Sequence, residues 1–425
     1  MKILVIGSGG REHALCLAFK RSKSAVELYC ATGNAGIAEI AVCVDIKPEE
    51  IKKLTDFAVE KSIDLTFVGG EISLALGIVD EFEKRNLKII GASKQAAQLE
   101  ASKSFSKDFM ARHNIPTAVF ETANLPKVAI EILQNGKFGD ENSPVVVKAD
   151  GLAAGKGVVV AKNRNEAIEA IKDLTSGELI SQEAAEKIVL EECLFGREIS
   201  LLLFADGKNF ALMPPARDHK RIGEGDTGAN TGGMGVITDS SLLTQIQTDE
   251  IIESVIKPTL TGAKAEGFEF RGILFLGLMM TEKGVKVLEY NVRFGDPETQ
   301  AILIRLETDL VEICEAIEQQ MLDKLDIKWK EGSSACVVLA AENYPGKPQT
   351  GDVIYGLDET KNFENTQIIH AGTKLAAKEN FITSGGRVLG VTATGNDLNE
   401  ALNRAYEAVE KINWNGMQYR RDIGK

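Results

Sequence analysis

The first ninety residues repeat one pattern, in which a short apolar run is followed by a turn and an amphipathic stretch. Lys2–Ile6 is almost wholly apolar, which is typical of a strand buried on both faces of a parallel sheet. Glycines follow it and lead into a predicted helix over Arg11–Arg21. Similar apolar runs occur at Val26–Ala31, Leu65–Val68 and Lys88–Ile90. This alternation predicts a doubly wound parallel α/β sheet that ends near Glu100.

Composition excludes several classes of protein. A chain of 425 residues is long enough for about three domains, and its 44% hydrophobic residues can form buried cores. The net charge of −13 argues against a broad nucleic-acid surface, which would need a basic face. Six scattered cysteines and four histidines give poor support for a zinc site and fit a reducing cytoplasm. No apolar run approaches ~18 residues, so we expect a cytoplasmic protein with no membrane span.

The middle of the chain combines helices with a glycine-rich hairpin. Predicted strands at Val145–Lys148 and Val158–Ala161 flank the glycine-rich segment Asp150–Gly157. Helices are predicted at Ser102–His113 and near Asn165–Leu174 and Thr248–Ala265, and further strands at Ile188–Glu192, Ile199–Met213, Gly272–Met280 and Val285–Val292. From about Gly332, strands and a closing helix that begins at Asp397 predict a small α+β domain.

The glycine turn after the first strand predicts an anion site. Unpaired amides at a helix N-terminus can bind a phosphate, and Gly9 and Gly10 lie at such a junction. The dinucleotide fingerprint requires glycine where Glu12 stands, and the second strand ends in a further glycine turn around Asn34 instead of a ribose-binding acid. These turns favour a monophosphate over a dinucleotide. The alternative is a tight strand–helix junction that binds nothing.

The hairpin Lys148–Gly157 is a second candidate phosphate site. It differs from a Walker A loop because its glycine spacing is short by one, glycine replaces the Ser/Thr, and a strand follows. Lysines at its base (Lys148) and tip (Lys156) can still cover a triphosphate, and Lys107 can supply a third cation. A flexible surface hairpin with solvated lysines is the alternative.

The strand around residue 290 predicts a metal site. Period-two alternation places Glu289, Asn291 and Arg293 on one face. A carboxylate beside a carboxamide oxygen suits Mg²⁺ that also binds phosphate oxygens, and the arginine fork matches a carboxylate. A solvated strand face is the alternative.

A polar segment over residues 217–235, with six glycines and almost no apolar residues, is predicted as a long structureless loop. Its cations, its acids, among them Asp218, and its free amides are typical of a loop that closes over substrate. A disordered linker is the alternative.

These motifs together resemble the ATP-grasp superfamily, and specifically the glycinamide ribonucleotide synthetase family. The resemblance runs from end to end, through the segments GGREHAL, GNAG, KADGLAAGKGV, DHKR, DTGANTGGMG, NVRFGDPETQ, HAGTKL and GGRVL. At Val68-Gly69-Gly70-Glu71 the family usually has proline before the acid, so the rigidity of this turn differs.

The resemblance implies a role for each matching residue. It places ATP at Lys107, Lys148, Gly155, Lys156, Gly157, the hinge Glu191-Glu192-Cys193-Leu194 and the ribose-binding acid Glu198. It places Mg²⁺ or Mn²⁺ at Glu289 and Asn291, and phosphoribosylamine near Gly9, Gly10, Asn34 and Glu71. We assign Arg293 to the carboxylate of glycine and Asp218 to the amine that attacks.

The resemblance also implies an architecture and a reaction. We expect an N-terminal Rossmann-like domain (1–101), a two-subdomain ATP-grasp domain (102–326, flexible lid about 125–190) and a C-terminal α+β domain (327–425). The expected reaction joins glycine to 5-phosphoribosylamine through glycyl phosphate, with conversion of ATP to ADP, in a monomer or homodimer. Another ATP-grasp purine ligase, an NAD-dependent dehydrogenase and a nucleotide sensor remain as alternatives.

Overall fold

The computed structural model describes residues 1–24, 26–153, 157–177, 181, 184–376 and 380–425. Within these ranges, every helix falls short of the length and apolar character that a bilayer crossing requires.

The N-terminal segment forms the predicted parallel sheet, in the order β3-β2-β1-β4-β5. Its strands are β1 (Lys2–Gly7), β2 (Glu27–Thr32), β3 (Val42–Val44), β4 (Leu65–Val68) and β5 (Ile89–Ile90). Helices α1 (Gly10–Lys20), α2 (Ile51–Lys61), α3 (Glu71–Leu76) and α4 (Ile78–Lys84) connect them. The short edge strand β3 was not predicted, because its side chains are largely exposed and give no buried apolar run.

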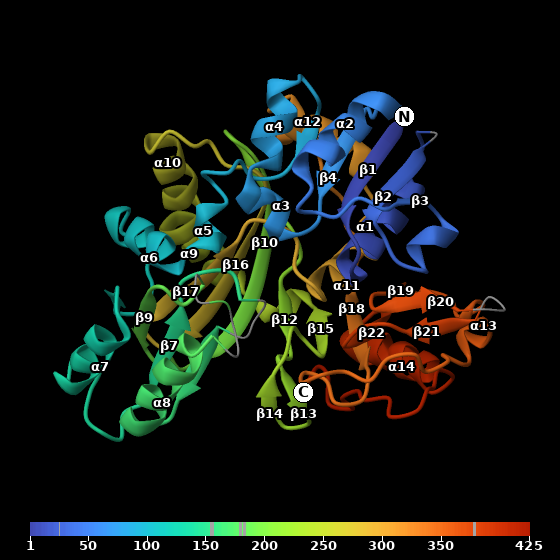
Figure 1. Cartoon of the computed structure of the whole chain (residues 1–425). Helices are drawn as coiled ribbons and strands as arrows, with labels where there is room; N and C mark the ends of the chain where they lie inside the picture. Colours follow the sequence, from blue (N-terminus) through green and yellow to red (C-terminus); the bar gives the residue numbers. More distant parts are fainter. Residues whose placement is uncertain (25, 154–156, 178–180, 182–183, 377–379) are drawn as a thin grey trace.

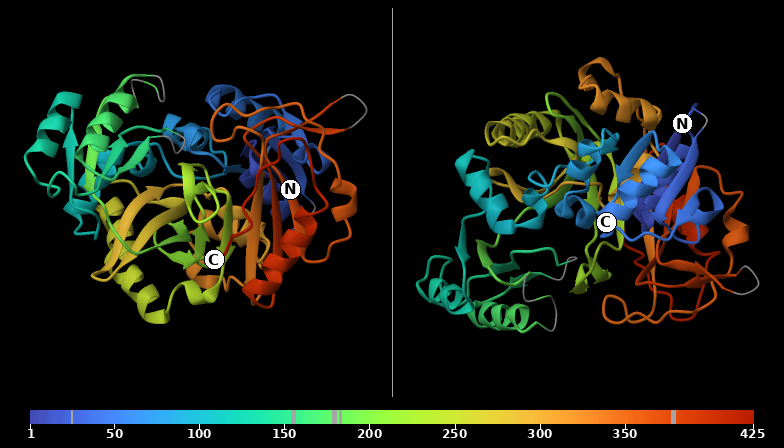
Figure 2. Two further views of the ribbon diagram at one scale, coloured as in Figure 1. Left: turned by 90° about the horizontal axis from the view of Figure 1, so that it is seen from below. Right: turned by 45° about the horizontal axis from the view of Figure 1, so that its top comes forward.

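A small antiparallel sheet in the order β6-β9-β7-β8 follows. It comprises β6 (Phe120–Ala123), β7 (Val145–Ala149), β8 (Val158–Ala161) and β9 (Ile188–Glu192). Apolar residues of α7 (Pro126–Gln134) and α8 (Arg164–Thr175) pack on it and give it a core of its own. In every view this unit lies on the opposite side of the molecule from the N-terminal sheet (Figures 1 and 2).

The central antiparallel sheet runs in the order β17-β16-β10-β12-β15-β18-β22-β19, with β11 paired to β10. Its strands are β10 (Arg197–Asp206), β11 (Phe210–Leu212), β12 (Ala216–Asp218), β15 (Gly235–Thr238), β16 (Arg271–Thr281), β17 (Gly284–Asn291), β18 (Ser333–Ala340), β19 (Thr366–His370) and β22 (Arg387–Gly395). The C-terminal segment therefore continues this sheet through the pairing of β15 with β18, which the sequence pattern did not predict.

Helices pack on this sheet and around its ends. They are α5 (Gln98–Ala101), α6 (Lys103–Arg112), α9 (Gln245–Ile251), α10 (Lys257–Ala265), α11 (Glu298–Leu303), α12 (Leu310–Glu318), α13 (Leu357–Thr360) and α14 (Leu398–Val409). The helix predicted near Thr248–Ala265 is confirmed: helical residues run without a break over 245–265, and a π-helical stretch, Ile252–Ile256, joins α9 to α10 just before Pro258. As predicted, the side chain of Asp397 caps α14 by accepting from the amide of Glu400 at 2.9 Å.

The prediction of a structureless loop over residues 217–235 is also wrong. This segment contains β12, the hairpin of β13 (Arg221–Gly223) with β14 (Thr227–Asn230), and the start of β15. A second small hairpin pairs β20 (Thr373–Leu375) with β21 (Phe381–Thr383). The strands within residues 217–235 were missed because they are formed by backbone pairing and have too few apolar side chains to show a hydrophobic periodicity in the sequence.

Candidate active site

Glu289 and Asn291 project from the same face of β17. They pair with Gly277 and Phe275 of β16, and the register shifts next to Gly277. A Cβ atom at residue 277 would lie 3.1 Å from Cγ of Glu289, so glycine there leaves room for the glutamate side chain. The strand therefore presents a carboxylate and a carboxamide side by side.

Cations surround Glu289. Burial acts to raise its pKa, but the positive charges of Lys220, Lys148 and Lys103 outweigh burial and lower the pKa below its usual value. The carboxylate is therefore ionised at neutral pH. Together with Asn291 it forms a hard-oxygen donor pair that fits Mg²⁺ or Mn²⁺. Across the described ranges no cluster of three or more acidic, histidine or cysteine side chains could hold a metal.

Arg293 lies just beyond the end of β17 and joins the central sheet to the N-terminal segment. Its Nη2 lies 2.9 Å from Oδ1 of Asn291 and 2.7 Å from Oε1 of Glu100. Its Nε donates to Oε2 of Glu71 at 3.2 Å, and Nη1 donates to the carbonyl of Phe294. Two predicted substrate residues, Arg293 and Glu71, thus form an ion pair, and Glu100 binds the same guanidinium.

Lys107 of α6 and Lys148 of β7 hold one buried carboxylate between them. Their Nζ atoms lie 2.8 Å and 2.7 Å from the two oxygens of Glu191. All three residues are 7% exposed or less. Burial and the charge of Lys148 lower the pKa of Lys107 to about 8, despite the opposing effect of Glu191. The predicted phosphate lysines and the first hinge residue therefore form one cluster.

Three predicted ATP residues, Glu192, Cys193 and Leu194, lie at the end of β9 and in the turn that follows it. Oε1 of Glu192 accepts from the amide of Val119 at 2.9 Å, and Cys193 and Leu194 are half-buried in the segment that leads to β10. Glu198, at the start of β10, forms an ion pair with Lys220 at 3.0 Å. The carbonyl of Gly157 accepts from the amide of Ala149 at 2.8 Å, whereas Gly155 and Lys156 lie outside the described residues.

Two buried carboxyl groups, those of Asp218 at the end of β12 and Glu298 at the start of α11, influence each other. Burial and the negative charge of Glu298 raise the pKa of Asp218 well above its ordinary value. Burial likewise raises the pKa of Glu298, whose Oε1 accepts from the hydroxyl of Ser200 at 3.2 Å. Oδ1 of Asp218 is buried, and no described residue hydrogen bonds to it. A carboxylate whose pKa is raised is a better proton acceptor than an ordinary aspartate.

The first glycine turn is filled by protein carboxylates, so the expectation of free amides is wrong for Gly9. Its amide donates to Oε2 of Glu12 at 2.6 Å, and the amide of Arg11 donates to Asp296 at 3.2 Å. Cβ atoms at Gly7 and Gly69 would lie within 2.5 Å and 2.1 Å of the Glu12 side chain. Both glycines thus make room for Glu12, which excludes the dinucleotide arrangement. Gly10 is the first residue of α1, at the junction where the sequence placed it.

Asn34 has both ends of its side chain occupied. Its Nδ2 donates to the carbonyls of Ser8 and His370 at 2.9 Å, and its Oδ1 accepts from the amide of Ile37 at 3.0 Å. The side chain therefore fastens the second glycine turn to the first turn and to β19.

Several charged residues of this region were not assigned by sequence reasoning. They are Glu100, Lys103, Lys220, Glu298 and Arg387. Lys220 and Arg387 lie in the DHKR and GGRVL segments, so motif membership was the signal available for them. Nη1 of Arg387 donates to the carbonyls of Gly232 and Asp296, both at 2.6 Å.

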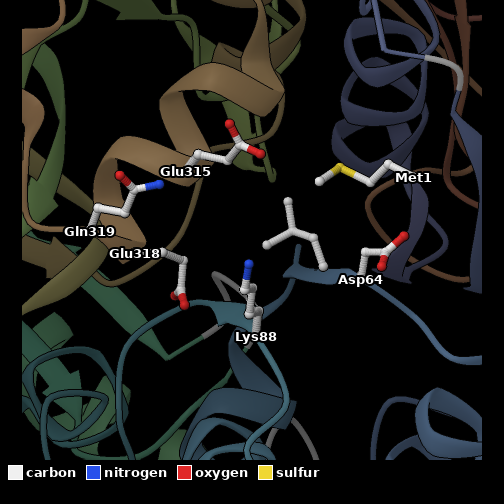
Figure 3. A pocket seen from close by; sticks show the side chains of 7 residues that line it. Met1, Asp64, Lys88, Glu315, Glu318 and Gln319 are labelled. Atoms are coloured by element: carbon white, nitrogen blue, oxygen red, sulfur yellow. The ribbon is translucent and has the colours of Figure 1, made fainter.

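A cavity of about 170 Å³ lies at the other end of the parallel sheet. Met1, Asp64 and Lys88 directly precede β1, β4 and β5, and α12 supplies Glu315 and Glu318 (Figure 3). The glycine turns follow the carboxyl ends of β1 and β2, so this cavity is separate from the candidate site.

Family models match nearly the whole chain. The N domain, ATP-grasp (A) domain and C domain of phosphoribosylglycinamide synthetase match residues 1–100, 101–299 and 334–425. Phosphoribosylamine–glycine ligase of Caldanaerobacter subterraneus subsp. tengcongensis is 44% identical over 423 residues, covering 100% of this chain and 99% of that protein. The Vibrio vulnificus (strain YJ016) ligase is 46% identical over 427 residues, covering 100% and 98%.

Solved structures agree with these matches. The crystal structure of phosphoribosylamine–glycine ligase from Thermotoga maritima is 35% identical, with a TM-score of 0.84 over 99% of this chain and 100% of that chain. Biotin carboxylase from Campylobacter jejuni matches with a TM-score of 0.73 over 98% and 92% of the two chains, but at 18% identity it shares the fold alone.

Proposed function

The chain belongs to the phosphoribosylglycinamide synthetase family, and on that premise we propose how its residues divide the work of the reaction. It is an ATP-dependent ligase that joins glycine to 5-phosphoribosylamine in purine biosynthesis, giving glycinamide ribonucleotide, ADP and phosphate. One observation supports the assignment most strongly: Glu289 lies within a group of three lysines and next to Asn291.

We assign ATP to the region between the small sheet and the central sheet. Lys107 and Lys148 face the triphosphate once it displaces their contacts with Glu191. We assign Gly155, Lys156 and Gly157 to the same phosphates. The backbone at Cys193 and Leu194 contacts the base, next to Glu191 and Glu192. Glu198 binds the ribose after exchanging Lys220 for a hydroxyl. Cations around the phosphates stabilise the charge that moves to ADP during transfer.

Glu289 and Asn291 are the residues that fit a divalent metal. A divalent metal held there would neutralise phosphate charge. We propose Mg²⁺ or Mn²⁺, because carboxylate and carboxamide oxygens suit both.

Arg293 orients the carboxylate of glycine, and Asp218 serves the amine. A carboxylate oxygen attacks the γ-phosphorus, the bond to ADP breaks, and glycyl phosphate results. The nitrogen of phosphoribosylamine then attacks the acyl carbon, the carbon–oxygen bond to phosphate breaks, and Asp218 accepts the proton that nitrogen loses. The raised pKa of Asp218 suits this proton transfer. Gly9, Gly10, Asn34 and Glu71 form the ribonucleotide side of the site.

We propose domains at 1–101, 102–326 and 327–425, with a lid at about 125–190. The lid keeps water from glycyl phosphate, which hydrolyses readily. We further propose a cytoplasmic enzyme that acts as a monomer or homodimer.

Product analysis tests the function. ADP and phosphate formation should require both glycine and 5-phosphoribosylamine, and mass spectrometry should detect glycinamide ribonucleotide. Turnover with a different ribonucleotide in place of 5-phosphoribosylamine would favour another ATP-grasp purine ligase. Binding of NADH without ATP turnover would contradict the proposal.

A further inference from the structure

We infer that the last residues of the chain are positioning residues for the reaction, because they hold the β13–β14 hairpin and so fix Lys220. This inference rests on the proposed function, in which Lys220 lies beside Glu198 and Glu289. We define residues 417–425 as the tail.

Arg420 is the centre of the contact. It is 1% exposed, yet its guanidinium reaches three groups outside its own backbone. Nη1 lies 2.7 Å from Oδ1 of Asp226, at the turn of the hairpin, and 3.2 Å from the carbonyl of Arg221 on β13. Nη2 lies 2.7 Å from Oδ2 of Asp422, whose same carboxylate oxygen accepts from the amide of Gly225 at 2.8 Å. A buried charge with satisfied donors specifies one geometry for the hairpin.

The tail also contacts His219, which precedes Lys220 in sequence as Arg221 follows it. The amide of Gly424 donates to Nε2 of His219 at 3.1 Å, which requires the unprotonated nitrogen on that side of the ring. Burial lowers the pKa of His219 to about 4, so the ring is neutral and Nδ1 carries the proton that faces the carbonyl of Gly235. The tail therefore contacts His219 and Arg221, the two neighbours of Lys220 in sequence.

The hairpin has little support of its own. Its strands carry no large apolar side chain except Ile222, and residues 224–230 are exposed. The carbonyl of Lys220 is held by the amide and hydroxyl of Thr231, both at 2.8 Å, so any displacement of the hairpin moves Lys220 with it. Near the end of the same segment, Arg387 and the hydroxyl of Tyr344 hold Gly232. Residues of the C-terminal segment thus hold residues 217–235 in place, whereas a loop that closes over substrate would need to be free to move.

The consequence is a role for the C-terminal segment in catalysis. Without the contacts of the tail, Lys220 is no longer held in the position from which it pairs with Glu198 before ATP binds and lies beside Glu289. We expect release of the tail to lower kcat/KM for ATP on the order of 10-fold, since small misplacements at a reacting centre have effects of that size or larger.

Two graded variants and a control test this. Arg420→Met removes the central charge. Asp226→Asn removes only the negative charge of the partner at the turn, because its amide oxygen can still accept from Arg420. Asn also tolerates the positive φ of 53° at residue 226, so the backbone conformation is kept. Asp326→Asn is the control, since Asp326 is 87% exposed, lies outside the hairpin and the tail, and undergoes the same chemical change.

Amide hydrogen exchange is measured beside kcat/KM on the full chain. We expect faster exchange confined to residues 221–230, with a roughly 10-fold loss of kcat/KM in Arg420→Met, a smaller loss in Asp226→Asn and none in Asp326→Asn. Unchanged exchange in the hairpin, or faster exchange with full kcat/KM, would overturn the inference. If Arg420→Met does not fold, hydrogen exchange and kcat/KM of Asp226→Asn alone test the inference. Failure of the proposed function is distinct, because the wild-type chain would then form no product while hairpin exchange still reports on the tail.

Discussion

Nη2 of Arg293 donates to Oδ1 of Asn291 at 2.9 Å, so the proposed glycine-binding arginine also orients the proposed metal-binding amide. The same guanidinium donates from Nε to Glu71 at 3.2 Å, on the N-terminal side of the site. A carbonyl oxygen has two lone pairs, so Oδ1 can accept from Arg293 and still face a cation. Binding of glycine and of the metal should therefore be coupled through Arg293.

Arg293→Lys tests this coupling. Lysine keeps the charge but lacks the planar fork that contacts Asn291, Glu71 and Glu100 together. We expect kcat/KM for glycine to fall about 100-fold, and the Mg²⁺ concentration for half-maximal rate to rise. Steady-state kinetics with varied glycine and Mg²⁺ measure both. Arg271→Lys, at a surface ion pair with Glu269, is the matched control and should change neither.

The Lys107 pKa of about 8 predicts pH-dependent ATP binding. The ammonium loses its proton as pH rises through this value in the free enzyme, so affinity for the triphosphate should fall above about pH 8. Because a single proton is lost, the affinity can fall by at most about 10-fold per pH unit. Calorimetry with a non-hydrolysable ATP analogue between pH 7 and 9.5 measures the effect, and adenosine, which has no phosphate, serves as the control ligand. A constant Kd for the analogue over this range would contradict the prediction.

Asp218→Asn should separate the two half-reactions. Loss of the proton acceptor should lower kcat for amide formation about 100-fold. Wild-type kcat should fall as pH drops through the raised pKa of Asp218, because protonation removes the base, and the variant should lack this limb. Trapping of glycyl phosphate by hydroxylamine should persist in the variant. Asp358→Asn, whose side chain is 90% exposed, should behave as wild type. Full amide-forming kcat in Asp218→Asn would exclude the role.

Gly69→Ala should destabilise the fold. The added Cβ would lie 2.1 Å from Oε1 of Glu12, a residue that is 2% exposed and whose Oε2 already accepts from the amide of Gly9. We expect a loss of about 2 kcal/mol in the free energy of unfolding, typical of an overpacked core, by urea denaturation. Gly70→Ala is the adjacent control, since its Cβ would meet only a terminal nitrogen of Arg11 at 3.2 Å. Equal stability of the two variants would contradict the role given to Glu12.

Regular periodicity made most of the fold predictable. The strands β1, β4, β7, β9 and β17 were expected within about one residue of their observed ends, because each is a buried or alternating apolar run. The hairpin β13–β14 was missed because backbone pairing and contacts with Arg420 form it, and neither leaves an apolar pattern.

The site was predictable where residues are close in sequence. Alternation along β17 placed Glu289 beside Asn291 without knowledge of any partner strand. The contacts of Arg293 with Glu71 and of Lys107 with Glu191 join positions 222 and 84 residues apart, and no local spacing encodes them. Glu12 was noted as a departure from a fingerprint, but the two glycines that accommodate it are apparent only in three dimensions.

The most direct measurement is the rate of glycinamide ribonucleotide formation in a double variant, Glu289→Ala with Asn291→Ala, at saturating ATP, glycine and 5-phosphoribosylamine and varied Mg²⁺. We expect a rate lower by about 1,000-fold or more, since electrostatic groups at phosphoryl transfer contribute effects of this order. Formation of product at the native rate, with the native dependence on Mg²⁺, would place the reaction centre elsewhere.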